Sequence, residues 1–104
     1  MTMSEQRRAD VEFVRLADEL DCASLPAALR VITCSIQQAI AFERVVVVDL
    51  CDVTFLDSAG ITLLLVGQKQ ASQAGMSFHV RLGAGPVRDA LAVAGLLGYF
   101  ELVE

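Results

Sequence analysis

The chain of 104 residues has no tryptophan, one histidine and three cysteines, and these shortages exclude several classes of protein. Cys22, Cys34 and Cys51 are an odd number at spacings that match no disulfide or zinc framework. We therefore expect reduced thiols that serve as small apolar residues. His79 falls on the polar face of a predicted strand, with no cysteine or carboxylate at ligand spacing. The sequence thus predicts neither a metal site nor a bound cofactor.

Long apolar runs and an excess of positive charge are missing too. The apolar windows at 45–50 and 59–67 are much shorter than the roughly 20 residues that cross a bilayer. The first ten residues lack the apolar segment of a secretory signal. Thirteen acidic and eight basic residues give a formal charge of −5, which repels nucleic-acid phosphates and anionic lipid surfaces. We expect a cytoplasmic protein with no nucleic-acid partner and no direct membrane insertion.

What is present is the composition of one aliphatic domain. Hydrophobic residues make up 55% of the chain and charged residues 20%, which is far from the composition of a disordered chain. The length fits a single core. Residues 1–9 are polar and unpatterned and predict a flexible arm, so residues 10–104 are expected to form the domain.

The apolar periodicity predicts strands and helices in alternation. Val45 to Val48 form an unbroken β-branched run, which is typical of a central strand covered on both faces. The alternation of the first strand breaks at Phe13 and Val14, where a bulge or a second short strand is expected. The elements we expect are strands at 11–16, 45–50, 76–82 and 99–103, and helices at 24–42, 58–74 and 86–94.

Polar side chains gather after two of these strands. Functional groups in open α/β sheets collect beyond the carboxyl ends of the strands. One predicted loop contains Asp18, Glu19 and Asp21, and the other contains Asp52, Asp57 and Ser58. Asp57 and Ser58 at a helix start are explained most simply as capping residues. One residue suffices as a cap, however, which leaves a hydroxyl available for modification. Gly60 fits a place where another backbone comes close.

The run DVTFLDSAGITLLL, from Asp52 to Leu65, resembles the signature of STAS domains, in particular of bacterial anti-sigma factor antagonists. The segments LADELD at 16–21 and PVRDALAVAGL at 86–96 are similar to the family's first loop and third helix. The resemblance covers about residues 10 to 103. It implies a small single-domain STAS-like α/β fold. We expect a mixed sheet of four to five strands with about three helices mainly on one face.

The resemblance also implies a function in binding, without catalysis. In this family the serine that matches Ser58 is phosphorylated by an anti-sigma factor, which is an ATP-dependent serine kinase of the histidine-kinase-like type. The unphosphorylated form binds that kinase and releases the sigma factor, and a PP2C-type phosphatase reverses the modification. ATP and magnesium belong to the kinase. The residues that the resemblance implies for partner binding are Asp21, Asp57, Ser58, Ala59, Gly60 and Thr62.

Three features depart from the family pattern. Asp18 and Thr62 stand where relatives often have glycine, and the chain ends soon after its last predicted strand, where many relatives continue into a helix. Thr62 follows Ser58 by four residues, so it could present a second hydroxyl on the same face of the helix. We favour the other interpretation, in which Thr62 is a core or boundary residue that faces the rest of the domain.

Three other functions stay open at the level of sequence. A receiver domain, which is phosphorylated on an aspartate, is conceivable from Asp49, Asp52 and Asp57. The pair of acidic residues that such a domain has after its first strand, and the lysine after its last strand, are not apparent in this sequence. A hydrolase would need a base for Ser58, and the lone histidine is poorly placed in the sequence. The main alternative is a non-catalytic STAS subunit or scaffold of a lipid-transport ATPase or stress-signalling complex.

Overall fold

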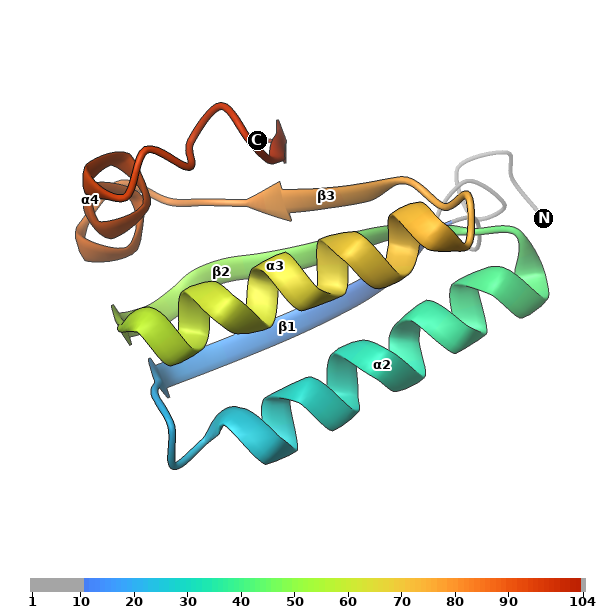
Figure 1. Ribbon diagram of the computed structural model, residues 1–104, viewed down its shortest axis with the longest axis horizontal. Helices are drawn as coiled ribbons and strands as arrows, with labels where there is room; N and C mark the ends of the chain where they lie inside the picture. The colour runs from blue at the N-terminus through green and yellow to red at the C-terminus, as the bar shows by residue number, and fades with distance from the viewer. Residues whose placement is uncertain (1–10, 104) are drawn as a thin grey trace, which may run out of the picture.

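The structure is a computed structural model that describes residues 11–103, in which strands and helices alternate (Figure 1). The arm predicted for residues 1–9 lies outside the described residues. The elements are β1 (Val11–Leu20), α2 (Leu25–Phe42), β2 (Val45–Leu56), α3 (Ser58–Gln73), β3 (Phe78–Arg81), α4 (Pro86–Val93) and β4 (Glu101–Val103).

The strands form a four-stranded sheet in the order β1-β2-β3-β4, and each neighbouring pair is parallel. The predicted small α/β fold is confirmed, but the described strands are all parallel where a mixed sheet was expected. The reason is that each connection between successive strands contains a helix, which returns the chain to the end where the previous strand began.

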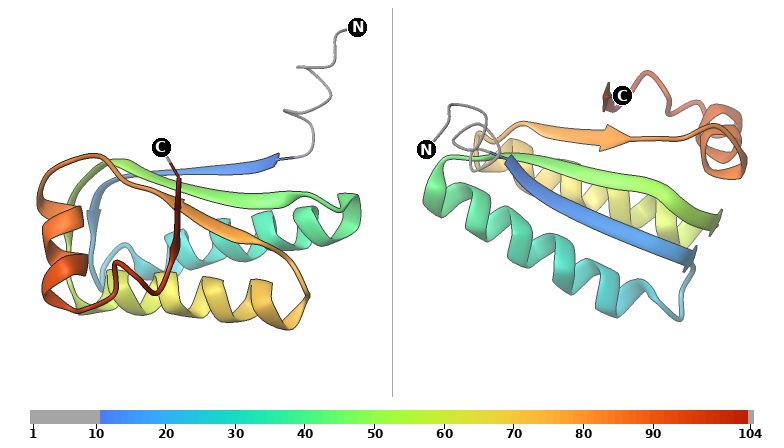
Figure 2. Two further views of the ribbon diagram at one scale, coloured as in Figure 1. Left: turned by 90° about the horizontal axis from the view of Figure 1, so that it is seen from above. Right: turned by 180° about the vertical axis from the view of Figure 1, so that it is seen from behind.

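Helices α2 and α3 lie against one face of the sheet, and no helix of the described chain lies over the other face (Figure 2). We call this second side the open face. Successive strands are neighbours that step across the sheet in one direction, so right-handed crossovers place both helices on the same side. Helix α4 lies beyond the carboxyl ends of the strands (Figure 1). The prediction of helices mainly on one face is confirmed.

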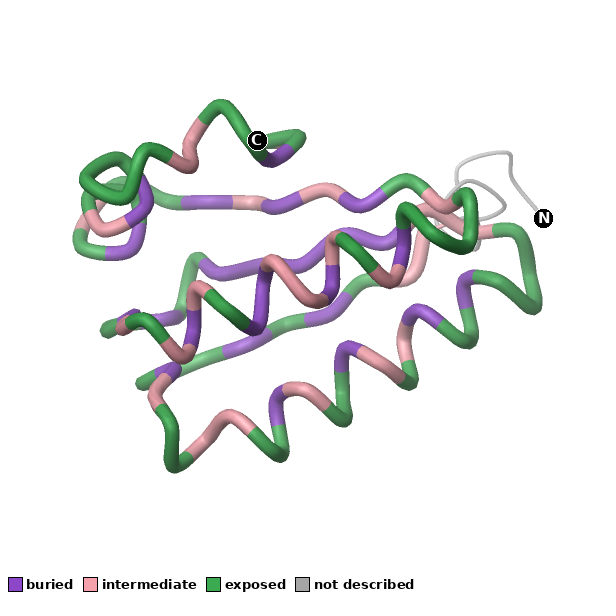
Figure 3. Tube along the Cα trace, in the orientation of Figure 1, coloured by how far each residue is buried: buried purple, intermediate pink, exposed green. Residues whose placement is uncertain are grey.

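The hydrophobic core lies mainly between the sheet and helices α2 and α3, and it extends to Val87 and Leu91 of α4 (Figure 3). Ile32 of α2, Leu64 of α3 and Val48 of β2 are fully buried there. β2 is a central strand, as its valine run predicts. Val47 points to the open face and is only 9% exposed, although no helix covers it there. Its neighbours in register are Phe13 and His79.

Helix α2 is long and apolar enough to span a membrane when judged by length and composition alone, with a mean hydropathy of 1.3 over 18 residues. The apolar windows at 45–50 and 59–67 do not include this helix. One side of α2 buries Ala28, Ile32, Ile36 and Ala39. An amphipathic core helix and a membrane span both satisfy such a length and hydropathy criterion, so packing has to distinguish them.

Two strands are longer than predicted. β1 continues to Leu20 and β2 to Leu56, so Asp18, Glu19 and Asp52 lie in strands, where loops were expected. Isolated propensity disfavours aspartate in strands, but pairing with a neighbouring strand overrides it. The register shifts twice, between Arg15 and Ala17 and again between Asp18 and Glu19. The irregularity expected at 13–14 therefore occurs further along the strand, where β2 has extra residues opposite β1.

Candidate functional site

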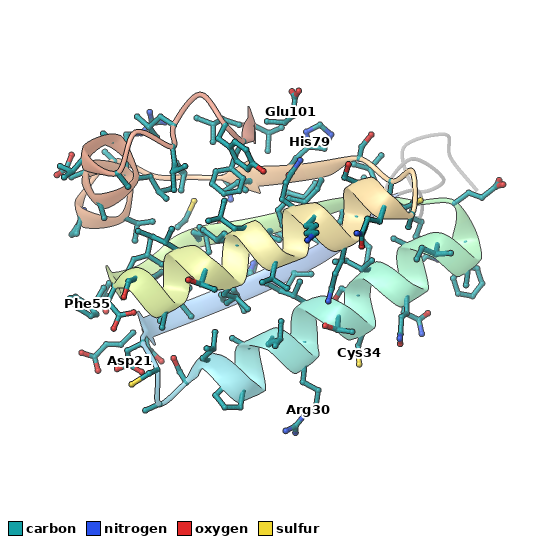
Figure 4. The ribbon with its side chains drawn as sticks, in the orientation of Figure 1. Asp21, Arg30, Cys34, Phe55, His79 and Glu101 are labelled. Carbon is teal, nitrogen blue, oxygen red and sulfur yellow. The ribbon has the colours of Figure 1, made fainter. Side chains whose placement is uncertain are left out.

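The ends of β1 and β2 and the starts of α2 and α3 meet at one end of the molecule, which we call the carboxyl end (Figure 1). Asp21 and Phe55, from the two strand ends, lie near each other there (Figure 4). Parallel strands bring their carboxyl ends to the same edge, so segments more than 30 residues apart in sequence become neighbours.

Asp57 is the residue that caps α3. Its backbone is extended, with φ −106° and ψ −168°, and its Oδ1 accepts hydrogen bonds from the N–H groups of Ala59 (2.8 Å) and Gly60 (3.2 Å). These N–H groups have no partner within the helix, so the carboxylate stabilises the helix start by about 1 kcal/mol. The interpretation of Asp57 as a cap is confirmed.

Ser58 is the first residue of α3 and is exposed. Within residues 11–103, the capping bonds are made by Asp57, and no hydrogen bond involves the Ser58 hydroxyl. The sequence argument that one cap suffices therefore agrees with the structure. The helix start therefore presents an exposed hydroxyl that none of the described residues engages.

Thr62 follows one turn later on the same side of α3, and it is also exposed. Its Oγ1 donates a hydrogen bond of 2.8 Å to the carbonyl oxygen of Ser58. The interpretation of Thr62 as a core or boundary residue is wrong, because its side chain lies on the solvent side of the helix. Its hydroxyl is already engaged by the backbone, whereas the Ser58 hydroxyl is free of such a bond.

Gly60 is buried where α3 meets the end of β1. A Cβ atom at this position would lie 2.8 Å from the carbonyl oxygen of Leu20 and would overlap the side chain of Leu56. The same Leu20 oxygen accepts a hydrogen bond of 3.3 Å from the N–H of Asp57. The prediction of a close backbone approach at Gly60 is confirmed, and it holds the helix start against β1.

Asp21 organises the turn that leads into α2. Its Oδ1 accepts hydrogen bonds of 3.0 Å from the N–H groups of both Ala23 and Ser24. The Ser24 hydroxyl in turn accepts from the N–H of Asp21 at 3.0 Å and donates to the carbonyl of Glu19 at 2.9 Å. Because Asp21 directly follows Leu20, the structure brings it to the end of the molecule that holds Ser58.

Asp49 does not belong to this group, although the receiver-domain alternative places it with Asp52 and Asp57. It lies on the open face, and its side chain is 4% exposed between Arg81 (3.1 Å) and Arg15 (3.7 Å). Burial acts to raise the pKa of this carboxyl. The hydrogen bonds from Cys51 and Arg81 outweigh burial and hold the pKa below its usual value. Sequence reasoning missed this cluster, since its members come from three strands.

The structure also shows where the three cysteines and the single histidine lie. Cys22, Cys34 and Cys51 are free thiols, as expected, and all three are exposed. His79 is half-buried on β3, in register with Glu101 of β4, and the two side chains lie side by side (Figure 4). Among the described residues, no group of three histidine, cysteine, aspartate or glutamate side chains is arranged to hold a metal ion.

Comparison with known proteins gives one family and one fold. A family model described as "Mlab, STAS domain" matches residues 3–104. An anti-sigma factor antagonist from Mycobacterium paratuberculosis is similar in structure, with a TM-score of 0.77 and 24% identity over 89% of this chain and 76% of that one. The unphosphorylated form of the anti-sigma factor antagonist SpoIIAA has a TM-score of 0.66 and 16% identity, over 91% and 80% of the two chains. No curated protein matches the chain.

The two kinds of comparison agree with the sequence motif. The similar structures share the arrangement of strands and helices described above, and the family match includes the whole of the Asp57–Gly60 turn and both strand ends beside it. The resemblance seen in the run from Asp52 to Leu65 is therefore confirmed, and the chain belongs to the STAS-domain family.

Proposed function

We propose that this protein is a cytoplasmic anti-sigma factor antagonist without catalytic activity of its own. Its unphosphorylated form binds an anti-sigma factor that is also a serine kinase, and the sigma factor is released. Phosphorylation of Ser58 ends the binding, and a PP2C-type phosphatase restores it. ATP and magnesium serve the kinase. The observation that carries the proposal is the exposed Ser58 hydroxyl on a helix start that Asp57 already caps.

Phosphorylation at this position can change binding without unfolding the domain. A phosphate adds a charge of about −1.5 to −2, and the start of a helix favours it by at most about 1 to 2 kcal/mol. Asp57 opposes it, because unit charges about 6 Å apart at an effective dielectric near 20 repel by about 2 to 3 kcal/mol before screening by salt. These terms have opposite sign and similar size, so the fold is expected to persist.

Binding is more sensitive than folding, because a partner has to remove water from the phosphate. A phosphate placed beside a carboxylate or in an apolar interface disrupts the contact through repulsion and desolvation. A penalty of about 3 kcal/mol already weakens binding more than a hundredfold. The charge that the fold tolerates is therefore sufficient to release a partner.

A second candidate function is a docking role in another complex. The matching family model is described only as "Mlab, STAS domain", and that description mentions no sigma factor. Under this alternative, the protein is a non-catalytic STAS subunit of a lipid-transport ATPase or a stress-signalling scaffold. The start of α3 would then be a permanent contact surface, and phosphorylation would be irrelevant to it.

Phosphate transfer tests the proposed site directly. The protein is incubated with ATP and the purified partner kinase, and the phosphorylated residue is identified by mass spectrometry. We expect one phosphate on Ser58, none in Ser58→Ala, and full transfer to Ser72→Ala, a control that removes an exposed serine hydroxyl near the end of α3. Phosphate on another residue, or none from an active kinase, would show that Ser58 is not the switch.

Partner recovery separates the two candidate functions. Ser58→Ala and Ser58→Asp forms are used as bait in extracts of the source organism. The antagonist function predicts that the alanine form retains an ATP-binding anti-sigma factor and that the aspartate form loses it. Equal recovery of a transporter ATPase by both forms would favour the docking subunit.

A further inference from the structure

An apolar groove runs between the start of α3 and helix α4, next to Ser58. Its lining includes Phe55 and Ile61 on one side and Pro86, Ala90 and Val93 of α4 on the other, with Asp89 as the polar member. Val93 is 90% exposed and Phe55 is 47% exposed. Large apolar side chains exposed together beside polar groups are typical of protein-binding surfaces.

The groove is continuous with the phosphorylation site proposed above. Ile61 follows Ser58 by three residues, a spacing that places both on the same side of a helix. Phe55 and Leu56 are the last residues of β2 before Asp57. A partner that covers the Ser58 hydroxyl would therefore meet the edge of the groove within one helical turn.

Charge is distributed very unevenly over the molecule. The carboxyl end holds six of the thirteen acidic residues and one of the eight basic residues, and the remainder of the sequence is balanced at seven of each. The net charge of −5 is thus located entirely at this end. The charged residues counted there are Asp18, Glu19, Asp21, Asp52, Asp57, Asp89 and Arg88. Such a field attracts a positively charged surface and speeds its association.

We propose that this groove binds a large apolar side chain of the anti-sigma factor, carried on a segment that also presents lysine or arginine to the acidic surroundings. The proposal rests on the proposed function and adds to it the chemistry of the partner. Burial of an apolar side chain supplies affinity, and the basic residues supply orientation and rate. A phosphate on Ser58 would need to lose water beside this apolar contact, which is unfavourable.

Other exposed apolar side chains do not line the groove. Val31, Ile40 and Phe42 on α2 are 46 to 58% exposed, and none of them is among the residues that line it. Val31 supplies a matched control, because it is an exposed valine on a helix, as Val93 is.

The test measures the affinity for the anti-sigma factor recovered with the Ser58→Ala bait and then prepared as a recombinant protein. Val93→Asn should weaken binding about tenfold, since it removes the burial of one valine side chain. Val31→Asn should leave the affinity unchanged. Both positions are exposed, and valine and asparagine have similar helix propensities, so both variants should fold.

The salt dependence of the dissociation constant tests whether basic residues of the partner meet the acidic surroundings of the groove. We expect the dissociation constant to rise when NaCl increases from about 50 to about 300 mM, because salt screens exposed charges. The double variant Asp52→Asn/Asp89→Asn should show a smaller rise. Glu43→Gln, at the opposite end of α2, should behave as the unchanged protein.

Three results would overturn the proposal. If Val93→Asn binds normally while Ser58→Asp does not bind, the groove is not the docking site and the proposed function stands. If binding is insensitive to salt, the partner surface is not basic. If the Ser58→Ala bait recovers no anti-sigma factor, the proposed function fails and the docking proposal fails with it.

Discussion

Single residues at the carboxyl end have separable roles in the fold and in the proposed binding. Asp57 caps α3, Gly60 admits the backbone of Leu20, and Ser58 between them makes no hydrogen bond through its hydroxyl within the described chain. Asp18 adopts a left-handed conformation with φ +63°, next to the second register shift between β1 and β2. Aspartate tolerates this region better than most residues.

Gly60→Ala should destabilise the fold by about 1 to 3 kcal/mol, because the added methyl group overlaps Leu56 and approaches the Leu20 carbonyl. Urea unfolding followed by circular dichroism measures the change. Gly98→Ala is the matched control, since a Cβ at Gly98 meets no atom within 4 Å. It should shift the free energy of unfolding by less than about 0.5 kcal/mol. Equal effects of the two substitutions would contradict the close approach at Gly60.

At the scale of elements, the carboxylate of Asp49 links three strands on the open face, because it forms ion pairs with arginines of both neighbouring strands. Arg15 of β1, Asp49 of β2 and Arg81 of β3 are neighbours in register, and Asp49 also accepts a hydrogen bond of 2.9 Å from the N–H of Cys51. No helix of the described chain covers this side, yet the Asp49 side chain is only 4% exposed between the two arginines. The exposed Cys51 thiol has a raised pKa, chiefly through its hydrogen bond to Asp49.

The Asp49→Asn variant tests this cluster through the pH dependence of the free energy of unfolding. The folded pKa of Asp49 is held below its ordinary value of 3.8, so its charge stabilises the fold above about pH 4 and ceases to do so as pH falls through the folded pKa. We expect the variant to be less stable by about 1 kcal/mol at pH 7, since the arginines are partly exposed.

The free energy of unfolding of both forms is measured from pH 8 to pH 3. The difference between them should be constant down to about pH 5 and should narrow as pH falls further toward the folded pKa. Asp52→Asn, which removes an exposed charge from the same strand, should show no such difference. A gap of the same size at pH 3 and at pH 5 would mean that the charge of Asp49 is not its source.

At the scale of the whole molecule, one end carries the net charge, the apolar groove and the accessible serine together. The remainder of the sequence is electrically balanced, and Ser58 is exposed, whereas the core residues are buried. A change of charge at Ser58 is therefore expected to act on the surface that meets a partner and to leave the packing of the core unaltered.

Ser58→Asp should consequently preserve the fold. The attraction of the helix start for the new carboxylate and its repulsion by Asp57 nearly offset each other, so stability should change by less than about 1 kcal/mol. Thermal unfolding checks this, with Ser72→Asp, at an exposed serine near the end of α3, as the control. A Ser58→Asp form that is unfolded would contradict a switch that acts through the surface.

Much of the architecture follows from local patterns in the sequence. The valine run predicts a central strand, the spacing of apolar residues predicts α2 and α3, and Gly75 and Gly95 adopt positive φ just after α3 and α4. The motif around Asp57 and Ser58 also identifies the helix start, because capping and helix periodicity are properties of short segments.

Other features depend on contacts between segments that are distant in the sequence. The extension of β1 and β2 through acidic residues, the placement of Asp49 between two arginines and the groove against α4 each require strands and helices to be brought together. The sequence by itself determined the order of elements and the serine at the start of α3. Only the tertiary structure decided which side chains surround that serine, because parallel pairing places segments far apart in the chain at the same end of the sheet.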